Sequence, residues 1–241
     1  MSINDITGVP REEIFITTKV WIEHYGYEQT KKSVFESMQK LKVDYIDLVL
    51  LHQPFGDYYG AWRALEDMYA EGKIRAIGIS NFYPDRMIDL ASFARLKPMV
   101  NQVETHPHNQ QIEAQKWMEK YGIQIEAWAP FGEGRGGLFT NETIAAIGKI
   151  YNKSVAQVIL RWELQRGIVV IPKSVHIERM EQNFNVFDFE LTDEDMAVMA
   201  SLDKKESSFF SHTDPNMVEW FVKMVEERKK NNDHKKEKKN W

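Results

Sequence analysis

The sequence has 241 residues, of which 43% are hydrophobic and 28% are charged, and it contains no cysteine. This composition is typical of a soluble globular protein, and the length suits one large domain. No apolar stretch approaches the ~20 residues that a membrane helix needs, and the polar residues 1–13 lack the apolar core of a signal peptide. Without cysteine there is no disulfide and no thiolate chemistry, so we expect a cytoplasmic location.

The charge is distributed unevenly along the chain. The formal net charge is −5, yet residues 228–241 hold seven Lys and Arg against Asp233 and Glu237, so the remaining residues carry −10. An acidic folded part argues against nucleic-acid binding. We therefore expect neither nucleic acid nor a membrane as a partner.

Short apolar runs alternate with amphipathic stretches along the chain. The runs are rich in β-branched residues and almost continuously hydrophobic, which is typical of strands covered on both faces. We predict strands over 14–20, 45–51, 74–79, 99–103, 123–129 and 168–171. We predict helices over 28–41 and 58–71, one beginning at Pro84, and two that begin with capping boxes, Ser154 with Gln157 and Thr192 with Asp195.

The alternation of strands and helices predicts an α/β fold with a parallel sheet. No Gly-x-Gly-x-x-Gly follows a strand, since the glycine-rich residues 132–137 do not match that pattern, and this argues against a doubly wound dinucleotide fold. Polar or aromatic residues instead recur where the predicted strands end, namely Lys19, His52, Ser80, Asn81, Gln102, Trp128, Lys173 and Ser174. A (β/α)8 TIM barrel carries its active site at this edge, so we predict such a barrel. Six strands are two fewer than a barrel needs, and the shortfall lies before residue 14.

Each of these residues also has a purely structural interpretation when it is considered alone. Lys19 alone would be a lysine at a strand end whose side chain reaches toward solvent. His52 alone could be either a hydrogen-bonded structural residue or a catalytic residue. Ser80 with Asn81 suits a helix cap, and Trp128 suits the core. Arg179 is an ordinary solvated helix residue.

Four stretches together resemble the aldo-keto reductase family, in particular bacterial diketogluconate and glyoxal reductases. They are DYIDLVLLHQP (44–54), GKIRAIGISNF (72–82), VNQVETHP (100–107) and IPKSVHIER (171–179). The resemblance extends from about residue 8 to about residue 221. It implies an NADP(H)-dependent oxidoreductase that reduces small aldehydes or ketones to alcohols on a TIM barrel.

The resemblance assigns a role to each site residue. Lys19 and His52 match two members of a catalytic tetrad of Asp, Tyr, Lys and His, and Trp21 with His52 would contact the carbonyl substrate. Ser80, Asn81 and Gln102 match the residues that bind the nicotinamide carboxamide, and Trp128 matches the ring on which the nicotinamide stacks. The residues that match those binding the adenosine 2′-phosphate and the adenine are Lys173, Ser174, Val175, Arg179 and Asn183. Gln182 stands where many members of the family have Glu.

The physical chemistry of these side chains agrees with the implied roles. Hydride transfer to a carbonyl builds negative charge on its oxygen, so hydrogen-bond and proton donation there lower the barrier. A phenol with a pKa near 10 is a weak acid, and a nearby lysine cation makes it a stronger one. Lysine and arginine suit a doubly charged phosphate, which is the usual basis for preferring NADP over NAD.

The family pattern breaks ahead of Lys19. The catalytic Asp and Tyr of the family lie upstream of the lysine, and no residue here matches them, because Tyr25 and Tyr27 follow Lys19. We therefore expect an N-terminally truncated barrel that lacks about two βα units, is impaired or inactive, and self-associates through its exposed sheet edges. A start recorded inside a longer gene, a genuine truncation, and a non-catalytic NADP-binding or interaction protein on a partial barrel remain as explanations.

The remaining expectations concern metal binding and the C-terminal region. The seven histidines show no spacing that suits a metal site. Residues 1–225 are expected to form the reductase domain, and the charged residues 226–241 a disordered tail. The aromatic residues Phe209, Phe210, Trp220 and Phe221 either line the substrate pocket or pack a terminal helix.

Overall fold

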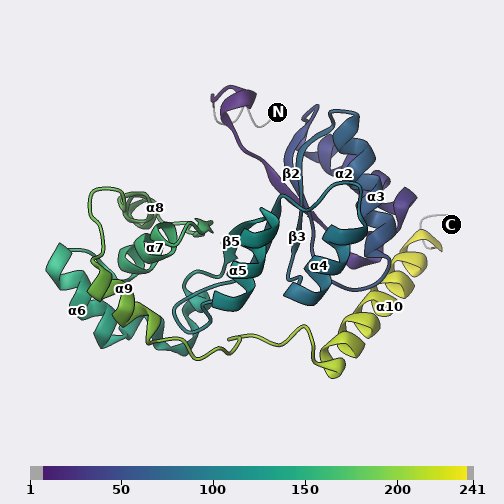
Figure 1. The fold of residues 1–241 in the computed structure, drawn as a ribbon. Helices are drawn as coiled ribbons and strands as arrows, with labels where there is room; N and C mark the ends of the chain where they lie inside the picture. Colours follow the sequence, from purple (N-terminus) through teal and green to yellow (C-terminus); the bar gives the residue numbers. More distant parts are fainter. Residues whose placement is uncertain (1–7, 238–241) are drawn as a thin grey trace. The chain divides into compact units, whose positions relative to one another are not determined.

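The computed structural model describes residues 8–237 and divides the chain into two compact units (Figure 1). The first unit comprises Met1–Lys97 with Phe210–Trp241, and the second comprises Pro98–Phe209. Strands and helices alternate in both units, as the sequence predicts.

The first unit contains the strands β1 (Thr17–Val20), β2 (Ile46–Leu51) and β3 (Ile74–Ser80). They pair in parallel, with Lys19 opposite Leu50, and Leu51 opposite Ile79. Every residue of β2 is buried, which agrees with its continuous hydrophobicity. The parallel register brings the carboxyl ends of the three strands to one edge.

Helices connect these strands. They are η1 (Arg11–Glu13), η2 (Ile22–His24), α2 (Tyr27–Leu41), α3 (Tyr58–Ala70) and α4 (Pro84–Phe93). α2 packs on α3, where the Tyr27 hydroxyl donates a hydrogen bond to the Asp67 carboxylate at 2.7 Å. α4 begins at Pro84, as predicted. Backbone N–H groups in the first helical turn have no acceptor within the helix, so proline, which lacks an N–H, loses no hydrogen bond there.

The chain ends in one long helix, α10 (Pro215–Glu237), which also belongs to the first unit. This helix covers residues 226–237, where the sequence led us to expect a disordered tail, and residues 238–241 lie outside the described residues. Glu and Lys have high helix propensity, so a segment that cannot form a core can still continue a helix that has already begun.

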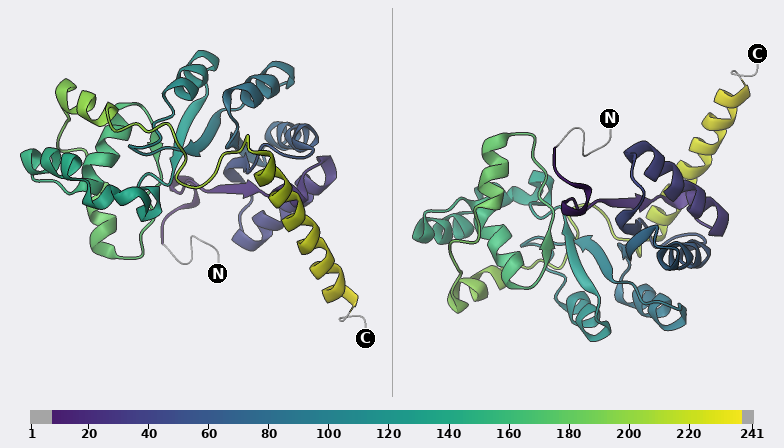
Figure 2. Two further views of the ribbon diagram at one scale, coloured as in Figure 1. Left: turned by 90° about the horizontal axis from the view of Figure 1, so that it is seen from below. Right: turned by 90° about the horizontal axis from the view of Figure 1, so that it is seen from above.

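The second unit contains the parallel strands β4 (Val100–Glu104), β5 (Gln124–Trp128) and β6 (Val169–Val170). Its helices are α5 (Ile112–Tyr121), η3 (Gly132–Thr140), α6 (Glu142–Tyr151), α7 (Val155–Gln165), α8 (Ile177–Phe184) and α9 (Asp193–Ala200). The helices α6 to α9, drawn in green, lie together in every view (Figures 1 and 2). Both predicted capping boxes are present, at Ser154 before α7 and at Thr192 before α9.

The helices α6, α7 and α9 of the second unit share a hydrophobic core. Its fully buried members are Leu138, Ile144, Ile147, Val158, Ile159, Trp162, Leu191 and Met199. This core holds the carboxyl end of α7, after which β6 begins. Within the described residues no helix is long and apolar enough to cross a membrane, and no three His, Cys, Asp or Glu side chains gather as metal ligands.

One ionisable side chain lies inside this unit without a hydrogen-bond partner. Glu163 on α7 is fully buried, and neither of its carboxylate oxygens is hydrogen-bonded to any of the described residues. Burial raises the pKa of Glu163 well above its ordinary value, while the Arg166 charge one turn later opposes this effect only in part. The folded protein therefore favours the protonated, neutral form.

We predict that Glu163→Gln stabilises the protein at pH 8 by about 1 kcal/mol or more. The pKa of Glu163 is higher in the folded state than in the unfolded state. Wild type therefore loses stability as the pH rises from the unfolded-state pKa near 4.3 up to the folded-state pKa, and glutamine, which does not titrate, removes that loss. Urea unfolding at pH 4 and pH 8 measures the effect, which we expect to be small at pH 4. A destabilised variant at pH 8 would show instead that Glu163 is ionised and paired with Arg166.

Candidate active site

Lys19 and His52 lie at the carboxyl ends of neighbouring strands in the first unit. Lys19 is the third residue of β1, and His52 follows β2, where its backbone N–H donates a hydrogen bond to the Val20 carbonyl at 3.0 Å. The next residue after β1 is Trp21, whose indole ring meets the His52 ring edge-on with the centroids 4.8 Å apart. The three residues that the family resemblance selects here are therefore neighbours in the structure.

The surroundings of His52 keep its imidazole neutral. Burial, followed by the positive charges of Lys19 and His212, lowers the pKa of His52 to about 4. A neutral imidazole at physiological pH can donate one hydrogen bond and accept another.

Trp21 offers a further donor beside His52. Its indole N–H is buried and has no hydrogen-bond partner in the described part of the chain. A buried donor of this kind is costly unless a ligand or water satisfies it, which favours an oxygen-bearing ligand at this position.

Ser80 and Asn81 end β3 at the same edge, and both are buried. Asn81 has φ 64°, in the left-handed region that asparagine tolerates better than most residues. Its side-chain amide donates to the His52 carbonyl at 3.1 Å and to the Ser80 hydroxyl at 3.2 Å. These bonds connect the carboxamide-binding candidates to the loop that carries His52.

Aromatic residues from the C-terminal segment surround this edge of the first unit. Phe221 of α10 is buried, with its ring centroid 5.9 Å from Trp21 and 5.3 Å from Phe55. His212 lies nearby, at 4.7 Å from Phe210 and 6.1 Å from Phe55. Phe221 therefore packs beside the candidate substrate residue Trp21, which is compatible with both sequence interpretations. Sequence reasoning did not place His212 beside these rings, because it considered that residue only as a metal ligand.

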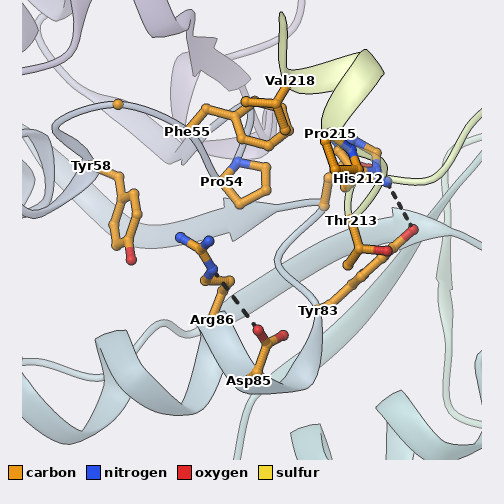
Figure 3. Close-up of a pocket in the computed structure, with 12 residues that line it drawn as sticks. Pro54, Phe55, Tyr58, Tyr83, Asp85, Arg86, His212, Thr213, Pro215 and Val218 are labelled. Atoms are coloured by element: carbon orange, nitrogen blue, oxygen red, sulfur yellow. Dashed lines mark hydrogen bonds and ion pairs between the residues drawn. The ribbon is translucent and has the colours of Figure 1, made fainter.

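A cavity of about 530 Å³ lies next to Phe55 and His212 (Figure 3). Phe55 and His212 form part of its wall, together with Tyr58, Tyr83 and Arg86. The close-up shows the Arg86 side chain above the Asp85 carboxylate, with 3.9 Å between their closest atoms, whereas the Tyr83 hydroxyl points away from this pair toward His212. The His212 backbone N–H donates to that hydroxyl at 3.4 Å.

The second unit carries the remaining sequence-predicted residues. Gln102 on β4 is buried, and its side-chain amide donates a short hydrogen bond to the Glu126 carboxylate on β5. Trp128 ends β5 and is half-buried, with its ring centroid 5.0 Å from that of Phe209.

A second cavity, of about 510 Å³, lies in this unit between the segment after β6 and the neighbouring helices. Its wall contains all five residues predicted to grip the adenosine end of the cofactor, namely Lys173, Ser174, Val175, Arg179 and Asn183. Gln182 and Phe139 line it as well, whereas Gln102 and Trp128 do not. Two cations with hydroxyl and amide groups form the donor set that a phosphate ester needs, so these residues fit a phosphorylated ribose.

The comparisons with known proteins identify the family of the chain. Residues 2–204 match the Aldo/keto reductase family. The chain is 50% identical to the glyoxal reductase of Bacillus subtilis over 201 residues, which span 83% of this chain and 72% of that protein.

Solved structures are similar as well. An aldo-keto reductase from a Medee basin deep-sea metagenome library has a TM-score of 0.85 and 42% identity, covering 88% of this chain and 79% of that one. An aldo-keto reductase of Bombyx mori, solved in complex with NADP, has a TM-score of 0.81 and 34% identity, covering 86% of this chain and 73% of that one. The predicted fold class, six parallel strands as in part of a (β/α)8 barrel, is therefore confirmed.

We predict that Lys19→Met raises the pKa of His52, because the lysine charge is one of the causes that lower it. In wild type the imidazole should stay neutral from pH 8 down to about pH 5, and it should begin to gain a proton only near pH 4. An NMR titration of the histidine ring protons, assigned with His52→Gln, measures both values. A wild-type pKa near 6.5 would contradict this description of the site.

Proposed function

Because the chain belongs to the aldo/keto reductase family, we propose that it is an NADP(H)-dependent oxidoreductase that reduces small aldehydes or ketones to alcohols. The observation that carries the proposal is the edge-on contact of the His52 and Trp21 rings at the carboxyl end of β2, next to the strand that carries Lys19. The family match alone gives the reaction class, and this geometry supplies groups that perform part of it.

His52 and Trp21 would orient the carbonyl of the substrate. NADPH, when bound, supplies the hydride that the carbonyl carbon accepts. Negative charge then grows on the carbonyl oxygen, and N–H groups aimed at that oxygen stabilise it most in the transition state. A neutral His52 donates such a hydrogen bond, and the Lys19 cation stabilises the charge electrostatically.

The cofactor residues divide into two groups by chemistry. Ser80, Asn81 and Gln102 offer the donors and acceptors that a carboxamide requires, and Trp128 offers a flat ring for the nicotinamide. Lys173 and Arg179 would pair with the 2′-phosphate, with Ser174, Val175 and Asn183 beside them in the same cavity. This set favours NADP(H) over NAD(H), which lacks that phosphate.

The substrate is a small carbonyl compound in this proposal. The relative from Bacillus subtilis is named for glyoxal, the smallest dialdehyde. Aromatic rings of Trp21, Phe55 and Phe221 pack closely around the His52 edge, which suits a compact substrate. A cytoplasmic location and self-association through sheet edges remain predictions from the sequence.

We propose further that these 241 residues by themselves have impaired reductase activity. Lys19 and His52 match half of the family tetrad, and no Tyr or Asp of this sequence matches the other half. A missing proton donor costs about 10²- to 10⁴-fold in rate. Alternatively, the chain is a non-catalytic NADP-binding or interaction protein. A chain that has only the Lys and His of the tetrad is compatible with this role as well.

We predict that the chain binds NADPH more tightly than NADH, and that Lys173→Met or Arg179→Met weakens NADPH binding by about tenfold each. Each variant loses one charged contact to the 2′-phosphate, so NADH binding should hardly change. Isothermal titration calorimetry measures both cofactors, with Lys149→Met on the exposed side of α6 as a matched control. Equal affinity of wild type for the two cofactors would refute the phosphate assignment.

We predict that glyoxal-dependent oxidation of NADPH by this chain has a kcat about 10²- to 10⁴-fold below that of the Bacillus subtilis relative. His52→Gln should lower the residual rate further, because it alters the donor beside the carbonyl oxygen. Steady-state absorbance at the NADPH band measures both rates. A rate equal to that of the relative would contradict the impairment, and NADPH binding with no turnover in either form would favour the non-catalytic alternative.

A further inference from the structure

A short segment of the second unit, Ser207–Phe209, is hydrogen-bonded to the carboxylate of Glu104 at the end of β4. Glu104 accepts a hydrogen bond from the Ser208 backbone N–H at 2.7 Å, and a short one from the Ser207 hydroxyl. The third donor is the His106 ring, at 2.9 Å. The segment and the strand are about a hundred residues apart in the sequence, so this carboxylate forms a long-range tether.

The tether holds a charged group in the interior. Glu104 is only 5% exposed. Burial alone would raise the pKa of Glu104, but the hydrogen bonds from His106, Ser207 and Ser208 outweigh it and lower that pKa below the ordinary range. A buried carboxylate with three donors is costly to disrupt, because removing the donors would leave an uncompensated charge. The segment therefore has one well-defined position relative to β4.

That position brings Phe209 against the candidate nicotinamide platform. The Phe209 and Trp128 rings lie 5.0 Å apart between centroids, at an interplanar angle of 57°. The Arg135 guanidinium lies over the Phe209 ring, 4.3 Å from its centroid, and also donates to the Ser208 carbonyl at 3.1 Å. Glu104 thus holds the two residues before Phe209, the Phe209 backbone N–H donates to the Ser207 hydroxyl at 3.0 Å, and Arg135 and Trp128 contact the Phe209 ring.

The tether also lies at the limit of the family match. That match ends at residue 204, so Ser207, Ser208 and Phe209 follow it, whereas Glu104, Arg135 and Trp128 lie inside it.

We propose that Glu104 is a positioning residue for the nicotinamide platform: by holding Ser207 and Ser208 it sets Phe209 against Trp128 and so fixes the face that the Trp128 ring presents. The inference rests on the proposed function, because it takes Trp128 to be the ring on which the nicotinamide stacks. Glu104 itself touches neither cofactor nor substrate in this account. Its effect should therefore appear only for ligands that contain a nicotinamide.

The test compares two ligands on the full 241-residue chain. Glu104→Gln keeps the shape and one acceptor oxygen but cannot accept from all three donors. We expect the Kd for NADPH, measured by calorimetry, to rise about fivefold, and the Kd for 2′,5′-ADP, which has the phosphate but no nicotinamide, to stay within about twofold. An unchanged Kd for NADPH, or an equal loss for both ligands, overturns the proposal, since equal loss indicates a general structural defect.

A double-mutant cycle tests the route from Glu104 to Trp128. In a Phe209→Ala background, Glu104→Gln should have no further effect on NADPH binding, because the intermediate ring is gone. Independent effects of the two substitutions would contradict the route. Glu113→Gln, whose carboxylate lies exposed on α5 of the same unit, is the matched control and should change neither Kd.

A cofactor-free measurement separates this inference from the proposed function. Near-UV circular dichroism should differ between wild type and Glu104→Gln, and that difference should vanish when Trp128→Phe is present in both. A wild-type chain that does not bind NADPH refutes the proposed function, while the spectra still decide whether Glu104 positions Trp128. A spectral difference that survives in the Trp128→Phe background refutes the positioning role.

Discussion

Parallel strand pairing is the constraint on which the rest of the structure depends. In each unit the register brings the carboxyl ends of neighbouring strands to one edge, so the residue that ends one strand lies beside the residue that ends the next. Lys19, His52 and Ser80 meet in this way in the first unit, although about 30 residues separate each from the next. The chemistry of the site therefore follows from backbone pairing before any side chain contributes to it.

Burial gives different protonation states to the ionisable groups near these strand ends, according to the partners that each one has. His52 is buried beside positive charges and stays neutral, which suits a hydrogen-bond donor to a carbonyl. Glu104 is buried with three hydrogen-bond donors and stays charged, which suits a tether. Glu163 is buried without hydrogen-bond donors among the described residues and favours its neutral form. All three groups are buried, and the local charges and hydrogen-bond donors decide which form each one takes.

Local patterns in the sequence were sufficient to predict most of the fold. Continuous apolar runs predicted each strand to within a few residues, and the serine and threonine capping boxes before α7 and α9 were read directly from spacing. The full length of α10 was missed, because a highly charged segment satisfies the compositional criteria for disorder and also has high helix propensity. Helix propensity prevailed in that segment.

The site could be predicted where a motif carried it, and not where only distant contacts define it. Lys173 and Arg179 were selected from one continuous stretch that matches the family, and the structure places both in the wall of one cavity. The hydrogen bonds from His212 to Tyr83 and from Ser207 and Ser208 to Glu104 could not be predicted, since they join positions about a hundred residues or more apart and follow no period. Contacts of this kind become visible only in the folded chain.

We propose that this chain binds NADP(H) through the residues assigned to the cofactor in each of the two units. Hydrogen–deuterium exchange of the 241-residue chain, with and without saturating NADPH, tests it most directly because it reports each segment separately. We expect NADPH to slow exchange in residues 173–183 and in the residues around Ser80 and Asn81, with little change in α2. Exchange that is unaltered in both segments, or protection confined to other parts of the chain, would contradict the claim.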